Sequence, residues 1–226
     1  MTITPSTLTR SAGVAALLAG LIFIVVQIGH PHLDVTSVGT TEWALRNTAK
    51  MLFAALALAG ITGMYLRQVK EMGVLGLVAY VLLSTGYLLI ISTAFVAGYV
   101  LPSLAQTDPA YVNGVLTAAA GGTATTDIGL IESALVAEGI TFLAGGFLFG
   151  IALYRARLLA RWAAVLLAAG AVVTLALPVL PDDLYRLLAY PNAVALIGLG
   201  YSLWRVQAAQ HNEDRSATRR PEHAIG

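Results

Sequence analysis

Long apolar stretches separated by short polar segments dominate the chain. Six of them run near 12–29, 44–66, 73–101, 127–154, 162–180 and 184–205. A helix needs about 20 mostly apolar residues to cross the roughly 30 Å of hydrocarbon in a bilayer. The stretches are continuous in Ala, Leu, Val and Gly and lack the alternation that a membrane β-barrel requires. The pattern predicts an all-α protein, a polytopic bundle of six transmembrane helices.

Composition agrees with lipid as the surroundings of this fold. Hydrophobic residues make up 58% of the chain, charged residues 11%, and the mean hydropathy is +0.78, values outside the range of soluble domains. The absence of Cys excludes structural disulfides, thiol catalysis and thiolate metal sites. A net charge of +1 without a basic block in the folded part gives no support for nucleic-acid binding. Membrane lipids are therefore the expected partners.

Positive charge is distributed unevenly between the two sides of the predicted membrane. If the N-terminus is cytoplasmic, ten of the thirteen Lys and Arg residues fall in inner segments, and Arg46, Lys50 and Arg186 remain outside. Cytoplasmic loops carry such an excess of positive charge. The first stretch has no small-x-small cleavage site after Gln27, so we expect an uncleaved span. The distribution predicts an N-in/C-in topology.

The polar segments define the expected domain organisation. Inner connections at 67–72 and 155–161 are short enough only for tight turns, so residues 1–206 should form one transmembrane domain. Residues 207–226 have the composition of a disordered cytoplasmic tail. The longest outer segment, 102–126, contains Asp108-Pro109, an arrangement that starts helices. A short helix over the outer mouth and a loose polar loop both fit this segment.

Glu138 is the most costly residue of the predicted membrane region. If the fourth helix begins near Ile128, a rise of 1.5 Å per residue places Glu138 about 15 Å below the outer edge. An ionised carboxylate at that depth costs on the order of 2.5 to 3.5 kcal/mol. We therefore expect Glu138 to face protein or water, and either to meet a cation or to stay protonated.

The same depth arithmetic places polar groups of other helices in one layer with Glu138. Counted from the outer helix ends, the groups at roughly 9 to 14 Å are Lys50, Thr93, Thr174 and Asn192. Glu132, at about 6 Å, and Arg46, one turn outside Lys50, form a second ion-pair candidate nearer the surface. Glu132 and Glu138 are six residues apart, a spacing that predicts different helix faces.

The inner half of the predicted bundle, in contrast, is nearly free of ionisable groups. A hydrophilic path through the membrane would need them there too. We therefore expect a pocket that opens outward or to the outer leaflet and is closed below, with Tyr80, Ser84 and Tyr87 as its floor. The expected ligand-binding residues are Lys50, Glu132, Glu138, Asn192, Thr93, Tyr87 and Arg46.

The same charges also admit a purely structural interpretation. Lys50 and Glu138 could form a buried ion pair that determines helix order. Arg46 could extend its guanidinium to the membrane interface beside Trp43. Both interpretations stay open at the level of sequence.

Two further patterns suggest local roles. His30, His32 and Asp34 are a chemically sensible metal set, but Pro31 bends the segment and no further ligand is near, so we expect an interfacial loop and neither metal nor cofactor. Small residues four apart, such as Gly146 and Gly150, let helix backbones approach closely in lipid. Such faces predict close packing within the chain, with a homo-oligomeric contact as the alternative.

Three segments of the chain resemble the second half of uncharacterised bacterial six-helix integral membrane protein families. They are Gly145–Arg155, the following basic loop with Arg161-Trp162, and the closing Tyr201–Arg205. A Pro often precedes the Arg-Trp pair in those families, whereas Ala160 stands here. The resemblance covers about a third of the chain and implies a multi-pass topology in the bacterial inner membrane. It implies no activity.

Three function classes follow from these residues. The first is a binding or transport-related protein that holds a small amphipathic or lipid-like molecule in the outer pocket. The second is a membrane-embedded enzyme with Glu138 as catalytic general acid or base on a lipid or isoprenoid substrate. No nucleophile triad, phosphate-binding loop or prenyl-diphosphate motif supports an enzyme, which leaves that question open. The third is a structural membrane subunit.

Overall fold

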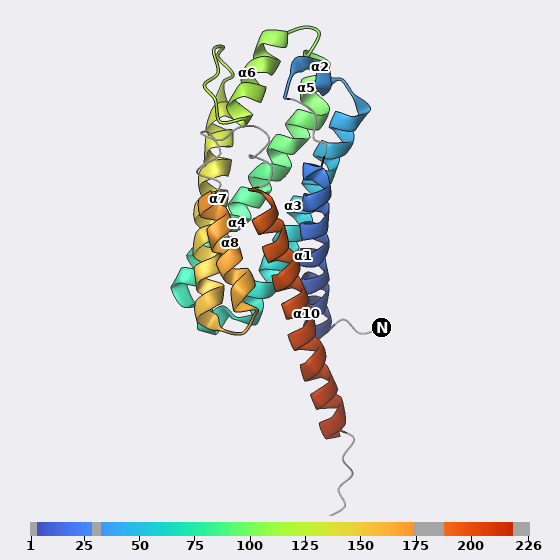
Figure 1. Ribbon diagram of the computed structural model, residues 1–226, viewed down its shortest axis with the longest axis vertical. Coiled ribbons are helices and arrows are strands. Elements are labelled where there is room, and N and C mark those ends of the chain that lie inside the picture. Colours follow the sequence, from blue (N-terminus) through green and yellow to red (C-terminus); the bar gives the residue numbers. More distant parts are fainter. Residues whose placement is uncertain (1–3, 29–32, 174–187, 219–226) are drawn as a thin grey trace, which may run out of the picture.

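The computed structural model describes residues 4–28, 33–173 and 188–218, and this part of the chain is helical without strands (Figure 1). The prediction of an all-α fold is thereby confirmed. Among the described residues, four helical segments are long and apolar enough to cross a membrane. They are α1 (Pro5–Gln27), α3 (Thr41–Arg67), the continuous segment α4 (Val69–Phe95), η1 (Val96–Val100) and α5 (Leu101–Leu104), and α7 (Leu130–Ala156).

The predicted fifth and sixth stretches are described in part. The fifth appears as α8 (Arg161–Val173), a shorter apolar helix, and the sixth lies within α10 (Tyr190–Thr218). Thr174 lies outside the described residues. α10 continues beyond residue 207, where we expected a tail to begin, because Ala, Gln, Glu and Arg have favourable helix propensity.

The long helices are arranged as a closed ring. α1 packs on α3, α3 on α4, α4 on α7, α7 on α8, α8 on α10, and α10 returns to α1. The short helices α2 (Val35–Val38) and α6 (Pro109–Ala119) lie together at the end opposite the N-terminus (Figure 1). We call the end with α2 and α6 the outer end and the opposite one the inner end.

Helix starts follow from local side-chain chemistry. The Thr4 side chain accepts from the Thr7 N–H before Pro5, and Thr40 accepts from the Trp43 N–H. Asp108 accepts from the Tyr111 N–H at 3.0 Å and so begins α6. These bonds satisfy amide groups that have no partner inside the helix. Of the two alternatives that the sequence left open for this segment, the structure shows the short helix.

Close helix contacts within the chain depend on glycine. A Cβ on Gly145 of α7 would lie 2.6 Å from the Leu83 Cα of α4, and one on Gly86 would lie 2.9 Å from the Phe142 Cα. A Cβ on Gly150 would lie 2.7 Å from the Ala164 carbonyl oxygen of α8. Small residues therefore bring neighbouring helices of one chain together, as expected for packing in lipid.

Two apolar clusters form the interior. The larger one joins all the long helices and contains Phe53, Tyr87, Phe149 and Leu199, each at most 3% exposed. The smaller cluster lies at the outer end, between α6 and the helix ends beneath it, and includes Trp43. The smaller cluster therefore covers the outer half of the ring, and residues of both clusters line the space between them.

Candidate ligand-binding cavity

A cavity of about 670 Å³ lies between α3, α4 and α7, with α6 at its outer side. α3 and α7 both pack on α4 and not appreciably on each other, so α4 forms the back wall of a space that separates them. Most of the walls are apolar. The sequence-predicted polar residues that line the cavity are Lys50, Thr93, Glu132 and Glu138. Its size is typical of sites for small molecules.

Aromatic rings close the cavity at its inner side. Phe53 and Phe142 line it, and Tyr87, only 1% exposed, packs edge to face on both, with centroid distances of 5.9 and 5.6 Å. Tyr87 thus lies behind the floor and not in contact with the space. Tyr80 lies away from the floor, because it stacks on Tyr65 at 4.7 Å.

Glu138 is held by a hydrogen bond across the α4–α7 contact. The Thr93 hydroxyl donates to Glu138 Oε2 at 2.6 Å. The same hydroxyl lies 3.1 Å from the Leu89 carbonyl oxygen, but it has one proton to donate. A charged acceptor gives the stronger bond, so an ionised Glu138 draws the Thr93 proton away from the helix backbone.

Lys50 lies on the opposite wall from Glu138. The two charges are near enough to interact, and Arg46 is the other charge that acts on Lys50. Within the described residues, however, the Lys50 ammonium has no hydrogen bond and no carboxylate within 4 Å. The direct Lys50–Glu138 ion pair considered from sequence is therefore not formed, because the cavity separates α3 from α7.

Arg46 lies outside this cavity. Its Nη1 donates to the carbonyl oxygens of Val26 and Ile28, both at 2.9 Å, and its guanidinium pairs with Glu42 at 2.8 Å. The last carbonyl groups of a helix accept no hydrogen bond from within the helix, and the helix dipole favours a cation at this end. Arg46 thus joins the end of α1 to α3 and is not paired with Glu132 as considered from sequence.

Two other predicted residues take different positions. Glu132 is exposed in the first turn of α7 and lines the cavity with Glu138, since the cavity covers a broad arc of α7. Both of these expected binding residues thus line the cavity, from different parts of that arc. Asn192, only 4% exposed, packs against Gly170 at the α8–α10 contact and does not line the cavity. From its depth, Asn192 was expected in one layer with Lys50 and Glu138, but its side chain faces α8 and not the cavity.

Sequence reasoning missed the role of Trp43 and Asn47, which also line the cavity. The Trp43 indole N–H donates to the Ala97 carbonyl oxygen at 2.7 Å, within the π-helical turn η1. π-helical turns leave backbone groups without regular partners and often occur at functional sites. Pro102, which lacks an N–H to donate into the preceding turn, was the available signal for this irregularity.

The segment from His30 to Asp34, for which we expected an interfacial loop and no metal, is described only from Leu33. Asp34 caps α2: its carboxylate accepts from the Thr36 hydroxyl at 2.6 Å and from the Ser37 N–H at 2.8 Å. The hydrogen bond from Thr36, followed by that from Ser37, lowers the pKa of Asp34 below its usual value. His30 and His32 lie outside the described residues. Asp34 is thus engaged in starting a helix.

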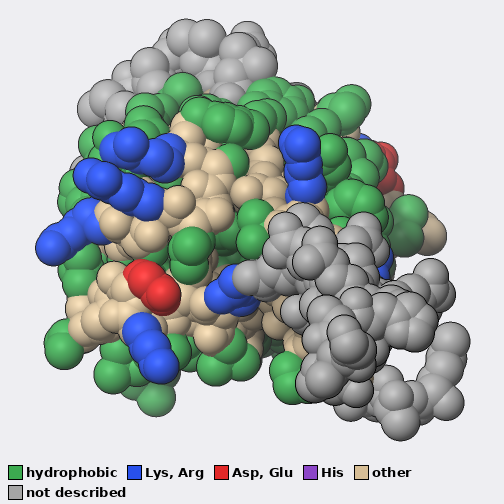
Figure 2. Space-filling model, turned by 90° about the horizontal axis from the view of Figure 1, so that it is seen from below, with side chains coloured by type: hydrophobic (Ala, Val, Ile, Leu, Met, Phe, Trp, Pro, Cys, Tyr) green, Lys and Arg blue, Asp and Glu red, His purple; other side chains and the backbone are tan. Residues whose placement is uncertain are grey.

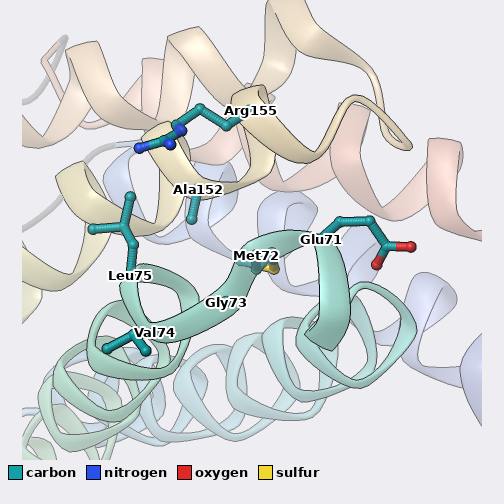
Figure 3. Close-up of a pocket in the computed structure, with 7 residues that line it drawn as sticks. All are labelled: Glu71, Met72, Gly73, Val74, Leu75, Ala152 and Arg155. Atoms are coloured by element: carbon teal, nitrogen blue, oxygen red, sulfur yellow. The ribbon is translucent and has the colours of Figure 1, made fainter.

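A smaller cavity of about 270 Å³ lies at the inner end (Figure 3). It forms where Gly73, with φ of +54°, interrupts the first turn of α4. Glu71 and Arg155 lie at different sides of this group of residues, and Ala152 contributes only a methyl group (Figure 3). Lys and Arg side chains gather on this end of the molecule (Figure 2).

The bond between Thr93 and Glu138 leads to a first prediction. In a double-mutant cycle of Thr93→Val and Glu138→Leu, we expect a coupling free energy of about 1 to 2 kcal/mol, because a hydrogen bond to a charged group contributes on that order. The measurement is the free energy of unfolding in mixed micelles. A matching cycle of Lys50→Met with Glu138→Leu should give a smaller coupling. Additive effects of Thr93→Val and Glu138→Leu would contradict the predicted bond energy.

Comparisons of this chain with protein-family models, with curated proteins and with solved structures found no match.

Proposed function

We propose that this chain is a multi-pass protein of the bacterial plasma membrane with six helices and both termini in the cytoplasm. Four long apolar helices support the membrane location, and α8 and α10 occupy the remaining places in the ring. Arg67, Lys70, Arg155 and Arg161 lie at or near inner helix ends, on the face where positive side chains gather (Figure 2). Excess positive charge on one side favours a cytoplasmic inner end.

The function that the cavity supports best is that of a binding or transport-related protein that holds a small amphipathic or lipid-like ligand. The observation that carries this proposal is the combination of apolar walls with Lys50 and Glu138 in one space of about 670 Å³. Sites for small molecules are mostly apolar with a few polar groups that orient the ligand. A purely structural role would not require the helices to enclose such a space, since membrane helices otherwise pack closely.

Substitutions of Gly139 test directly whether a ligand binds in the cavity. It lines the cavity, and a Cβ at this position would have no atom within 4 Å. We expect Gly139→Phe to obstruct part of the cavity while the fold is kept, and Gly139→Ala to leave it open. Native mass spectrometry of the protein from the membrane should show a small-molecule adduct in wild type and Gly139→Ala. In Gly139→Phe its abundance should fall to background.

The outcomes of this test separate the three function classes. An adduct that persists in Gly139→Phe would refute binding in this cavity. Empty spectra in all three proteins, also after reconstitution with lipid extract, would favour a structural subunit. Conversion of a bound lipid or isoprenoid into product, lost in Glu138→Gln, would favour an enzyme with Glu138 as its general acid or base.

A further inference from the structure

Opposite charges face the outer cavity from two helices that it separates. Lys50 comes from α3 and Glu138 from α7, and they interact electrostatically without a direct ion pair. We infer that the ligand has a zwitterionic head group, with its anionic part at Lys50 and its primary ammonium at Glu138, and an apolar chain. This inference rests on the proposed function and specifies the class of ligand for the same site.

Lys50 supplies the first half of the argument. Its ammonium carries three donors, and no described residue accepts a hydrogen bond from it. A cation within a membrane-spanning helix is costly unless an acceptor or counter-charge compensates it. Glu138 compensates it only across the cavity, and Arg46 opposes it. An anionic group bound between the walls would satisfy the donors of Lys50.

Glu138 supplies the second half. Oε2 accepts from Thr93 at 2.6 Å, which holds the carboxylate against α4, whereas no described residue donates to Oε1. One oxygen of an oriented carboxylate therefore remains for a donor in the cavity. A primary ammonium combines that donor with the complementary charge, and its hydrogen bond is of the strong, charge-assisted kind.

Charge balance distinguishes a zwitterion from a ligand with a single charge. Lys50 and Glu138 neutralise each other overall, so a purely anionic or cationic head group would add one uncompensated charge to a mostly apolar space. Of the other charges near the cavity, Arg46 pairs with Glu42, and Glu132, which also lines the cavity, is exposed to solvent in the first turn of α7, where water screens its charge. A zwitterion leaves the site neutral and meets both groups.

The rest of the cavity fits a hydrocarbon chain. Phe23, Phe53 and Phe142 line its inner part, and Phe23 stacks on Phe53 with ring centroids 4.4 Å apart. Such a surface binds apolar chains through burial of area and offers no polar competitor. The head group of the ligand would lie between Lys50 and Glu138, and its chain would pack against these rings.

The test compares single-chain lipids that share one saturated chain and differ in head group. The probes carry phosphoethanolamine, phosphate, primary ammonium or glycerol, and each is titrated into delipidated protein in detergent micelles and measured by native mass spectrometry. For wild type, we expect phosphoethanolamine to bind at least about tenfold more tightly than the other three. A charge-assisted contact corresponds to a factor of about 10 to 100.

Two charge-removing variants assign the orientation. Lys50→Met should weaken the phosphoethanolamine and phosphate probes about tenfold or more and spare the ammonium probe. Glu138→Gln should weaken the phosphoethanolamine and ammonium probes and strengthen the phosphate probe. Matched controls are Lys70→Met and Glu71→Gln, exposed charges at the inner end, which should leave all four affinities unchanged.

The outcomes keep this inference separate from the proposed function. If the probes bind in a way that Gly139→Phe abolishes, but a singly charged or neutral head group binds as tightly as phosphoethanolamine, the zwitterion inference is overturned and the binding function stands. If no probe binds wild type and no native adduct exists, the binding function itself fails. The wild-type ranking decides the inference even if a charge variant does not fold.

Discussion

Gly145→Ala is expected to lower the free energy of unfolding by about 2 kcal/mol. The added Cβ would lie 2.6 Å from the Leu83 Cα, so it meets the backbone of α4 and no flexible side chain that could turn away. Such overpacking costs about 1 to 3 kcal/mol or more, which outweighs the gain of about 1 kcal/mol that Ala brings to a helix interior. Reversible unfolding in mixed micelles measures this difference.

Gly139→Ala is the matched control, because it makes the same substitution in the same helix. A Cβ at Gly139 has no neighbour within 4 Å, so only the helix propensity of Ala remains. We expect a stability equal to wild type or up to about 1 kcal/mol higher. Equal destabilisation by the two substitutions would show that close α4–α7 contact is not what Gly145 provides.

Arg46→Met should destabilise the protein by about 2 to 4 kcal/mol. It removes two charge-assisted hydrogen bonds from Nη1 to the carbonyl oxygens of Val26 and Ile28 at the end of α1. Hydrogen bonds to charged groups contribute about 1.5 to 3 kcal/mol each, and the solvent access of this side chain, 18% exposed, reduces the sum. The free energy of unfolding in mixed micelles is again the measurement.

Glu42→Gln separates this capping role from the surface ion pair. Glu42 is 57% exposed, and pairs with such an exposed partner contribute at most about 1 kcal/mol. We therefore expect Glu42→Gln to have a small effect beside Arg46→Met. If the two substitutions cost the same, the ion pair and not the contact with α1 would explain the importance of Arg46.

The membrane-spanning pattern was readable from the chain because it depends on local composition. Continuous apolar stretches indicated α1, α3, α4 and α7, and the observed helix ends lie within seven residues of the predicted ones. The helical assignment was reliable for a physical reason, since backbone groups in lipid must be satisfied within the segment itself. The start of α6 is likewise a local property, because the Asp108 side chain caps the helix and Pro109 occupies its first position.

For the candidate site, the sequence predicted only the depth of its residues in the membrane. Rise per residue placed Lys50, Thr93 and Glu138 at one level, and these three do line one cavity. Depth carries no information on the rotation of a helix about its axis or on the distance between helices. Asn192 therefore lies in another contact, and Lys50 and Glu138 remain apart across the cavity.

Sequence by itself determined that this protein is helical and apolar, with costly polar groups in the outer half, since each of these depends on residues close together in the chain. Tertiary structure alone decided that Thr93 binds Glu138, that Arg46 caps α1, and that Gly145 allows α7 to meet α4. These contacts join residues at least 18 positions apart, and their existence depends on how the helices are rotated and packed, which no local pattern encodes.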